Sequence, residues 1–174
     1  MNQQGEGQKM KIDAATMQRL QSRLLSEQNL LLGIVGGFVA TLIGAAIWAA
    51  VTLATGYQIG WMAVGVGFLV GLAVRLLGKG ITPAFGLVGA VGALLGCLLG
   101  NLFSVCGFAA SQQNVPFSNL LFGLLSEPAA LVELCKATFQ PMDLLFYGIA
   151  VYEGYNFAFR QITAEDIQAM QSGR

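Results

Sequence analysis

The chain has 174 residues, 55% of them hydrophobic and only 10% charged, and its nine basic and nine acidic residues give a net charge of zero. A soluble domain usually carries about a quarter charged residues, so this composition excludes an ordinary water-soluble domain. Zero net charge gives no reason to expect nucleic acid as a partner. The chain has no histidine, which excludes histidine-based triads and histidine-ligated metal or haem.

Two long stretches of the chain carry no charge, one from Gln28 to Val74 and the other from Gly80 to Ser126. A transmembrane helix needs roughly 20 apolar residues in a row, so each stretch has room for one or two spans. The length fits a single domain. We therefore expect an all-α integral membrane protein with four transmembrane helices.

Residues 1–29 are polar and form the expected cytoplasmic N-terminal segment. Residues 1–11 look disordered, and Asp13 is a suitable N-cap for a following helix. Apolar residues then recur at helical spacing: Met17, Leu20, Leu24 and Leu31. This pattern predicts either an amphipathic helix on the membrane surface or a cytoplasmic extension of the first span. The apolar stretch that follows is too long for a signal peptide, so we expect it to be retained.

The four spans of the transmembrane domain (residues 30–160) are expected at residues 30–53, 59–77, 83–106 and 142–159. Thr82 and Pro83 are typical of the N-cap and first residue of a helix, since proline lacks only a donor that is unpaired there. Residues 161–174 are expected to form a cytoplasmic C-terminal helix. Thr163 and Asp166 have the spacing of a capping box at its start.

The outer segment, residues 107–141, is the weak point of this topology. Its apolar part, residues 117–125, is too short to cross a bilayer of roughly 30 Å, and prolines bracket it. We expect two short helices that lie at the outer interface or are partly re-entrant. The alternative is a fifth span, which would place Glu127 and Glu133 in the hydrocarbon at a cost of several kcal/mol.

The basic residues predict the orientation of the spans. Eight of the nine fall on one side of the four-span arrangement, and only Lys136 falls on the other. The positive-inside rule makes the first side cytoplasmic. Both termini are therefore expected in the cytoplasm, which agrees with an even number of spans.

Glycines recur at helical spacing in three of the expected spans, and small residues let membrane helices approach closely. They are Gly33 and Gly37 with a second row of Gly36, Ala40 and Gly44, then Gly67 and Gly71, then Gly92, Gly96 and Gly100, preceded by Gly86 and Gly89. Such rows predict helix packing faces. They leave open whether the contact lies within one chain or between chains, and a glycine face also suits a pore.

Glu153, in the fourth expected span, is the main candidate for a functional residue. A carboxylate at that depth is costly unless it is paired, neutralised or hydrated. Arg75 is a candidate partner, and four polar residues are candidates for supporting hydrogen bonds: Tyr147, Tyr152, Tyr155 and Asn156. One hypothesis is a proton or cation site, or a contact with a partner subunit. The other is a structural pair that fixes the helix register, with Arg75 otherwise snorkelling to the interface.

Other residues have plainer interpretations. Asp143 is expected to stabilise the N-terminus of the fourth span through the helix dipole. Trp48, Tyr57 and Trp61 are expected in an aromatic belt at the outer interface.

The three cysteines contain no CxxC pair, which excludes a thioredoxin-like redox motif. Cys106 and Cys135 both fall on the outer side, where an oxidising bacterial compartment would permit a disulfide. Two unpaired thiols are the equal alternative. Cys97 is expected to be inert packing.

Two segments carry a resemblance. Residues 56–71 (GYQIGWMAVGVGFLVG) and 147–155 (YGIAVYEGY) resemble a core found in small, uncharacterised multi-pass inner-membrane proteins of bacteria. The resemblance covers roughly the second to fourth spans and implies a bacterial inner-membrane location. It implies no activity and no site residues.

Three functions fit these features. The first is a non-catalytic membrane subunit or scaffold, which packs through its glycine-rich helix faces against other membrane subunits or against itself as a homo-oligomer. The alternative is a small oligomeric transporter or channel that uses Glu153 as a proton or cation site, although few other polar residues mark a path. A membrane enzyme ranks last, since no nucleophile–base pair or metal cluster is apparent. We expect no catalytic residue, metal or cofactor.

Overall fold

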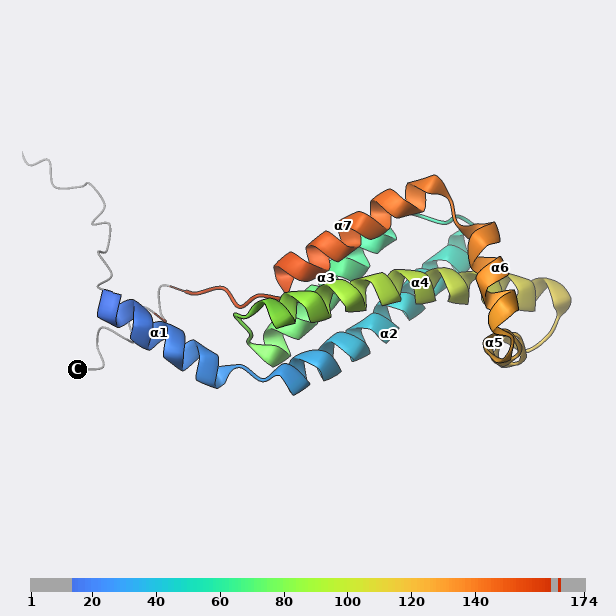
Figure 1. Cartoon of the computed structure of the whole chain (residues 1–174). Helices are drawn as coiled ribbons and strands as arrows, with labels where there is room; N and C mark the ends of the chain where they lie inside the picture. Colours follow the sequence, from blue (N-terminus) through green and yellow to red (C-terminus); the bar gives the residue numbers. More distant parts are fainter. Residues whose placement is uncertain (1–13, 164–165, 167–174) are drawn as a thin grey trace, which may run out of the picture. The chain divides into compact units, whose positions relative to one another are not determined.

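The structure is a computed structural model that describes residues 14–163 and residue 166, without the side chains of residues 14–16 and 135. Expectations for residues 1–13 and for the helix after Asp166 lie outside this range. By its internal contacts the chain divides into two units, one of residues Gln28–Arg160 and the other of the two chain ends. Every regular element of the described part is an α-helix (Figure 1), so the predicted all-α class is confirmed.

In the unit made of the two chain ends, the first described element is α1 (Ala14–Glu27), in which Leu20 and Leu24 are buried. The helix stops before Gln28 and Asn29, and Asn29 caps the next helix by accepting the Leu32 N–H at 3.0 Å. A capped break of two residues therefore separates α1 from α2, and the choice between a helix on the membrane surface and a cytoplasmic extension of the first span stays a prediction.

Near the other chain end, the predicted capping box is formed. The Thr163 N–H donates to Asp166 Oδ2 at 3.0 Å, and the Asp166 N–H donates to Thr163 Oγ1 at 3.4 Å.

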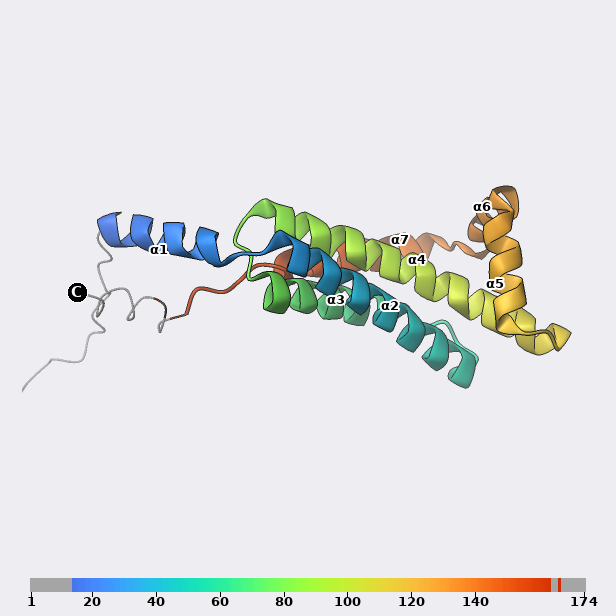
Figure 2. The ribbon, with the colours of Figure 1, turned by 90° about the horizontal axis from the view of Figure 1, so that it is seen from below.

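Four helices of the unit Gln28–Arg160 form a bundle: α2 (Leu30–Thr55), α3 (Met62–Gly78), α4 (Pro83–Gln113) and α7 (Pro141–Phe157). Both α3 and α4 pack against α2 and against α7, and they also contact each other. The helices α2 and α7 consequently occupy opposite corners, with α3 and α4 between them (Figures 1 and 2).

Two short helices, α5 (Phe117–Ser126) and α6 (Pro128–Thr138), lie across one end of the bundle, where α5 contacts α4 and α6 (Figure 2). Two short helices were expected here, and their placement at a membrane interface stays a prediction. At the other end of the bundle, backbone hydrogen bonds join the α3–α4 loop to the segment before α2 and to the segment after α7. The Asn29 N–H donates to the Gly78 carbonyl, and the Arg160 N–H donates to the Gly80 carbonyl, both at 2.8 Å.

The helix boundaries follow local signals. Thr82 is the N-cap residue of α4 and Pro83 its first residue, as expected. The helix continues through Gly107 to Gln113, beyond the expected end at residue 106, and ends where Asn114 adopts a left-handed φ of 58°. With 31 residues, α4 is about 46 Å long.

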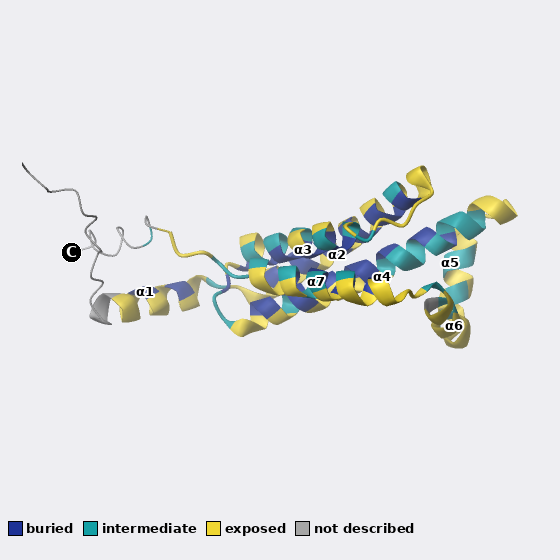
Figure 3. Cartoon of the chain, turned by 90° about the horizontal axis from the view of Figure 1, so that it is seen from above, coloured by how far each residue is buried: buried dark blue, intermediate teal, exposed yellow. Residues whose placement is uncertain are grey.

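Figure 3 shows that the bundle helices have buried and exposed faces, and the buried faces of α2 and α4 consist mostly of small residues. The buried residues of α2 are mostly glycine, alanine and threonine, whereas its exposed residues include Leu31, Phe38 and Ile43. The helix α4 follows the same rule, with Leu87 and Leu95 exposed. Among the described residues, α2 and α4 are the two helices that are long and apolar enough to cross a membrane.

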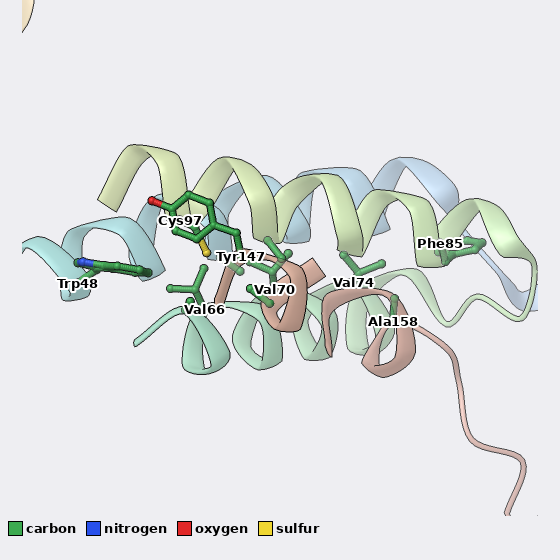
Figure 4. Close-up of a cluster of buried hydrophobic side chains, with 12 residues drawn as sticks. Trp48, Val66, Val70, Val74, Phe85, Cys97, Tyr147 and Ala158 are labelled. Carbon is green, nitrogen blue, oxygen red and sulfur yellow. The ribbon is translucent and has the colours of Figure 1, made fainter. Parts of the chain in front are cut away.

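The centre of the bundle is packed by residues of all four helices (Figure 4). Val70 and Val74 of α3, Cys97 of α4 and Ala150 of α7 have no exposed surface, and Trp48 of α2 has 1%. The cluster extends along the bundle from Trp48 at one end to Phe85 at the other (Figure 4).

Candidate functional site

The glycine rows bring the four helices into contact within one chain. Gly37 faces Val74 of α3, and a methyl group at Gly37 would lie 2.8 Å from that side chain. A methyl group at Gly92 of α4 would lie 2.8 Å from Val70 and 3.1 Å from the Thr41 hydroxyl of α2. This hydroxyl is 3.0 Å from the Gly92 carbonyl, to which it donates. The rows of α2 and α4 are therefore internal packing faces.

The remaining predicted glycines also have neighbours in the same chain. Gly33 meets Phe85, Gly36 meets Leu77, Gly44 and Gly96 meet Val66, Gly100 meets Trp48, and Gly86 meets Tyr155. The structure thus assigns the predicted seams to contacts inside the bundle, whereas the sequence left contacts between chains equally open.

The seam between α3 and α7 positions Glu153. A methyl group at Gly67 would meet the backbone of Ala150, and one at Gly71 would lie 2.9 Å from the Gly154 carbonyl oxygen and 3.3 Å from that of Glu153. Both glycines of α3 therefore admit the backbone of α7. Because the seam is so close, the depth of Glu153 relative to α3 is fixed by backbone contact, and Glu153 lies level with Gly71.

Glu153 lies at the edge of this seam. Ala150, Glu153 and Phe157 follow one another at helical spacing on the side of α7 that meets α3. Ala150 is buried and Glu153 is half-buried. Phe157 packs edge-to-face on Phe68 of α3, with ring centroids 4.9 Å apart. Because Phe68 is itself 45% exposed, the aromatic pair marks the outer edge of the seam, and Glu153, one turn before Phe157 on the same side of α7, belongs to this edge. We call this edge the α3–α7 rim.

Arg75 also belongs to the α3–α7 rim. It follows Gly71 by one helical turn and is half-buried near the end of α3. Within the described part of the chain, neither the Arg75 guanidinium nor the Glu153 carboxylate takes part in a hydrogen bond or ion pair. The predicted pair of Glu153 and Arg75 is therefore not formed, and the two opposite charges of this rim have no partner among the described residues.

The polar residues expected to support Glu153 lie apart from it. Tyr147 is buried beside Trp48, with ring centroids 6.5 Å apart. Tyr155 packs on Gly86 of α4 and on Phe159. Tyr152 is 66% exposed, and the Asn156 side chain donates to the Tyr152 carbonyl of its own helix at 2.9 Å. The structure does not assemble these four residues into a polar pocket around the carboxylate.

A polar network at the other end of the bundle was missed in the sequence. Asn101 of α4 accepts a hydrogen bond from the Gln58 side chain at 3.2 Å and donates one to the Thr138 hydroxyl of α6 at 3.5 Å. Asn101 and Thr138 line a cavity of about 40 Å³ together with Tyr147. The only available signal was an isolated asparagine in an apolar helix, which often bonds to another helix in membranes.

Trp48 does not lie in an aromatic belt, so this expectation is wrong. Its ring is 1% exposed and rests on the backbone of Gly100, whereas Tyr57 and Trp61 are 75% and 71% exposed. The Trp48 nitrogen and Tyr147 oxygen both point toward the end of the bundle where α2 ends (Figure 4). Gly100 decides the position of Trp48, because only glycine leaves room there for an indole ring.

The remaining predicted residues are Asp143 and the cysteines. Asp143 forms a capping box with Gln140, whose N–H donates to Asp143 Oδ2 at 2.9 Å, which is the expected stabilisation of the α7 N-terminus. Cys97 and Cys106 are buried free thiols. Because Cys106 is a free thiol, the predicted disulfide between Cys106 and Cys135 is not formed in this structure, and Cys106 fits the alternative of an unpaired thiol.

No three cysteine or acidic residues of the described part lie close enough together to hold a metal ion. No family model matches the chain, and no similar curated protein or solved structure is found. The geometry of the α3–α7 rim is therefore the basis for a functional proposal.

Proposed function

We propose that the chain is an integral protein of a bacterial inner membrane, with α2, α3, α4 and α7 as its four spans. The main support is the distribution of residues described above, with small residues inside the bundle and large apolar ones outside. In water, an apolar surface of this extent would favour aggregation or association. In a bilayer it meets lipid, and small residues inside allow close helix packing.

The two shorter helices are compatible with this topology. Both α3 and α7 have 17 residues, at the lower end of the range of roughly 17–25 residues that span a bilayer. The apolar residues that flank them, such as Ile59 and Phe159, extend the hydrophobic length. We propose that α5 and α6 lie at the outer interface, since Phe122 and Leu125 are exposed there.

The charges support an orientation with both termini in the cytoplasm. Arg75, Lys79 and Arg160 lie at the end of the bundle where α3 ends and α4 begins, and the Arg160 N–H bonds to Gly80. Lys136 belongs to α6 at the opposite end. The positive-inside rule then makes the first end cytoplasmic.

Cysteine labelling tests this topology. In a chain without its native cysteines, we expect Gln112→Cys and Ala137→Cys to react with a membrane-impermeant maleimide on intact spheroplasts. Gln161→Cys should react only after permeabilisation. Labelling of residues 112 and 137 from opposite sides would contradict four spans and favour a fifth one between them.

We further propose that the protein is a non-catalytic membrane subunit that binds another chain through the α3–α7 rim. The observation that carries this proposal is the half-buried Glu153 carboxylate, which has no partner within the described part of its own chain. In the hydrocarbon an ionisable group without a partner is costly. A donor on a second chain would remove this cost, whereas the internal glycine seams are already occupied.

The transporter alternative has less support. Valine, alanine and cysteine side chains without exposed surface fill the centre of the described bundle, so a single copy offers no polar path along its axis. A path would have to form between copies, with Glu153 facing it. Ion flux into liposomes that depends on Glu153 would favour this function over a subunit role.

Substitution of Glu153 tests the subunit role. We expect Glu153→Ala to reduce the recovery of associated chains from mild detergent at least tenfold, because the variant loses both charge and hydrogen-bonding capacity. Glu153→Gln should retain part of the association through its amide. The recovery is measured by native electrophoresis and mass spectrometry of the purified complex.

The matched control is Glu133→Ala, which removes an exposed carboxylate of α6 far from the rim. It should associate as the wild type does. Unchanged association of Glu153→Ala would sink the proposed role of the rim.

A further inference from the structure

We propose that the chain associated at the α3–α7 rim is a second copy of this protein, and that Glu153 of each copy binds Arg75 of the other. This inference rests on the proposed membrane location and names the partner that the rim would bind. It starts from two observations: the rim carries both a carboxylate and a guanidinium, and neither is paired within the described part of its own chain.

The positions of the two charges along the membrane normal suit a symmetric dimer. Glu153 lies level with Gly71, and Arg75 lies one turn further along α3, which is about 6 Å. Two copies inserted in the same direction keep the same depths and are related by a two-fold axis along the membrane normal. Arg75 of a second copy therefore arrives within one turn of Glu153, a gap that an arginine side chain can bridge.

The two-fold axis makes the rim complementary to itself. In such an interface the same patch is used by both copies, so a contact between two residues occurs twice. One rim with a single carboxylate and a single guanidinium thus yields two ion pairs and leaves no charge unpaired. Arginine binds a carboxylate through two parallel hydrogen bonds, and this pairing is stronger away from water.

The remaining surface of the rim permits close approach. Phe68, whose ring packs on Phe157 of α7, is 45% exposed. Gly65, one turn earlier on α3, has no atom of another residue within 4 Å of the position where a methyl group would stand. It lies beside the rim, at an apolar groove between α2 and α3 that Ile47 and Phe68 also line. A second copy would cover this aromatic and glycine surface together with the two charges.

Exchange of the two charges tests the inference directly. Two tagged forms of the chain are co-expressed, and the pairing of tags is measured in mild detergent and by energy transfer in liposomes. We expect wild-type chains to pair, and Glu153→Arg alone or Arg75→Glu alone to reduce pairing at least tenfold. Co-expression of Glu153→Arg chains with Arg75→Glu chains should restore at least half of the wild-type pairing.

The rescue between two different chains is decisive. In a mixed dimer, each basic side chain of the Glu153→Arg chain faces an acidic side chain of the Arg75→Glu chain, so two ion pairs form. They can form only if the pairs cross between copies. A chain that carries both substitutions is tested as well. If it pairs while the mixed chains do not, the ion pair lies within one chain and the inference is overturned. Wild-type chains that do not pair with each other would overturn it as well. Recovery of each single variant in the membrane fraction is the control, so that pairing is compared at equal amounts of inserted chain.

Discussion

Replacing Gly154 with leucine is expected to lower the free energy of unfolding of the bundle by about 3 kcal/mol or more. A methyl group at this position would lie 2.5 Å from the carbonyl oxygen of Gly89 and 2.8 Å from Cβ of Ala93. The obstacle is the backbone of α4, which cannot move aside as a side chain can. The helices α4 and α7 would have to separate, and α7 would lose its contact with the core.

Gly148 provides a matched control on the same helix. It is exposed, and no atom of another residue lies within 4 Å of its methyl position, so Gly148→Leu should change the free energy of unfolding by less than about 1 kcal/mol. Unfolding is measured by the reaction of a maleimide with Cys97, which has no exposed surface in the folded bundle, in a background without the other two cysteines. Similar midpoints for the two leucine variants would contradict the close α4–α7 crossing.

Replacing Trp48 with alanine is the second change with a large expected effect, a loss of about 3 kcal/mol. Trp48 is among the largest side chains that are fully buried in the described residues, and its ring packs on Gly100 and Tyr147. In a membrane the loss comes mainly from dispersion contacts around the cavity that alanine leaves. The same labelling of Cys97 during unfolding measures it.

Trp61 is the control for this change, since the chain has two tryptophans and Trp61 is 71% exposed. Its ring touches Phe146 with centroids 5.9 Å apart, so Trp61→Ala should cost about 1 kcal/mol or less. If Trp61→Ala were the more damaging variant, Trp48 would belong to the interface after all, as its sequence position suggested.

The helix boundaries could largely be predicted because their signals are local. Pro83, Pro128 and Pro141 each stand at the first residue of a helix, where the missing N–H costs nothing. The predicted end of α4 at residue 106 was early, since a hydropathy pattern stops at the expected bilayer thickness whereas the helix stops at Asn114. The cap at Asn29 was overlooked because Leu31 continues the apolar spacing of α1 across the break.

The candidate site was predictable only in part. Glu153 and Arg75 stand out because charges are rare in the apolar stretches of this chain. Their surroundings did not follow from spacing: Tyr155 faces α4, Tyr147 faces the core, and neither forms a pocket around the carboxylate. The network centred on Asn101 joins Gln58 and Thr138 from distant parts of the chain, and no periodicity in a single sequence relates such positions.

The sequence by itself determined that the protein is helical, where most of its helices begin, and which faces are made of small residues. These properties depend on side-chain volume, backbone propensity and hydropathy, which act over a few neighbouring residues. Only the tertiary structure decided that the glycine faces meet within one chain, that Trp48 is inside, and that Glu153 and Arg75 have no partner within the described part of the chain. These properties depend on which backbone lies opposite each residue, as Gly100 lies opposite Trp48 and Gly89 opposite Gly154.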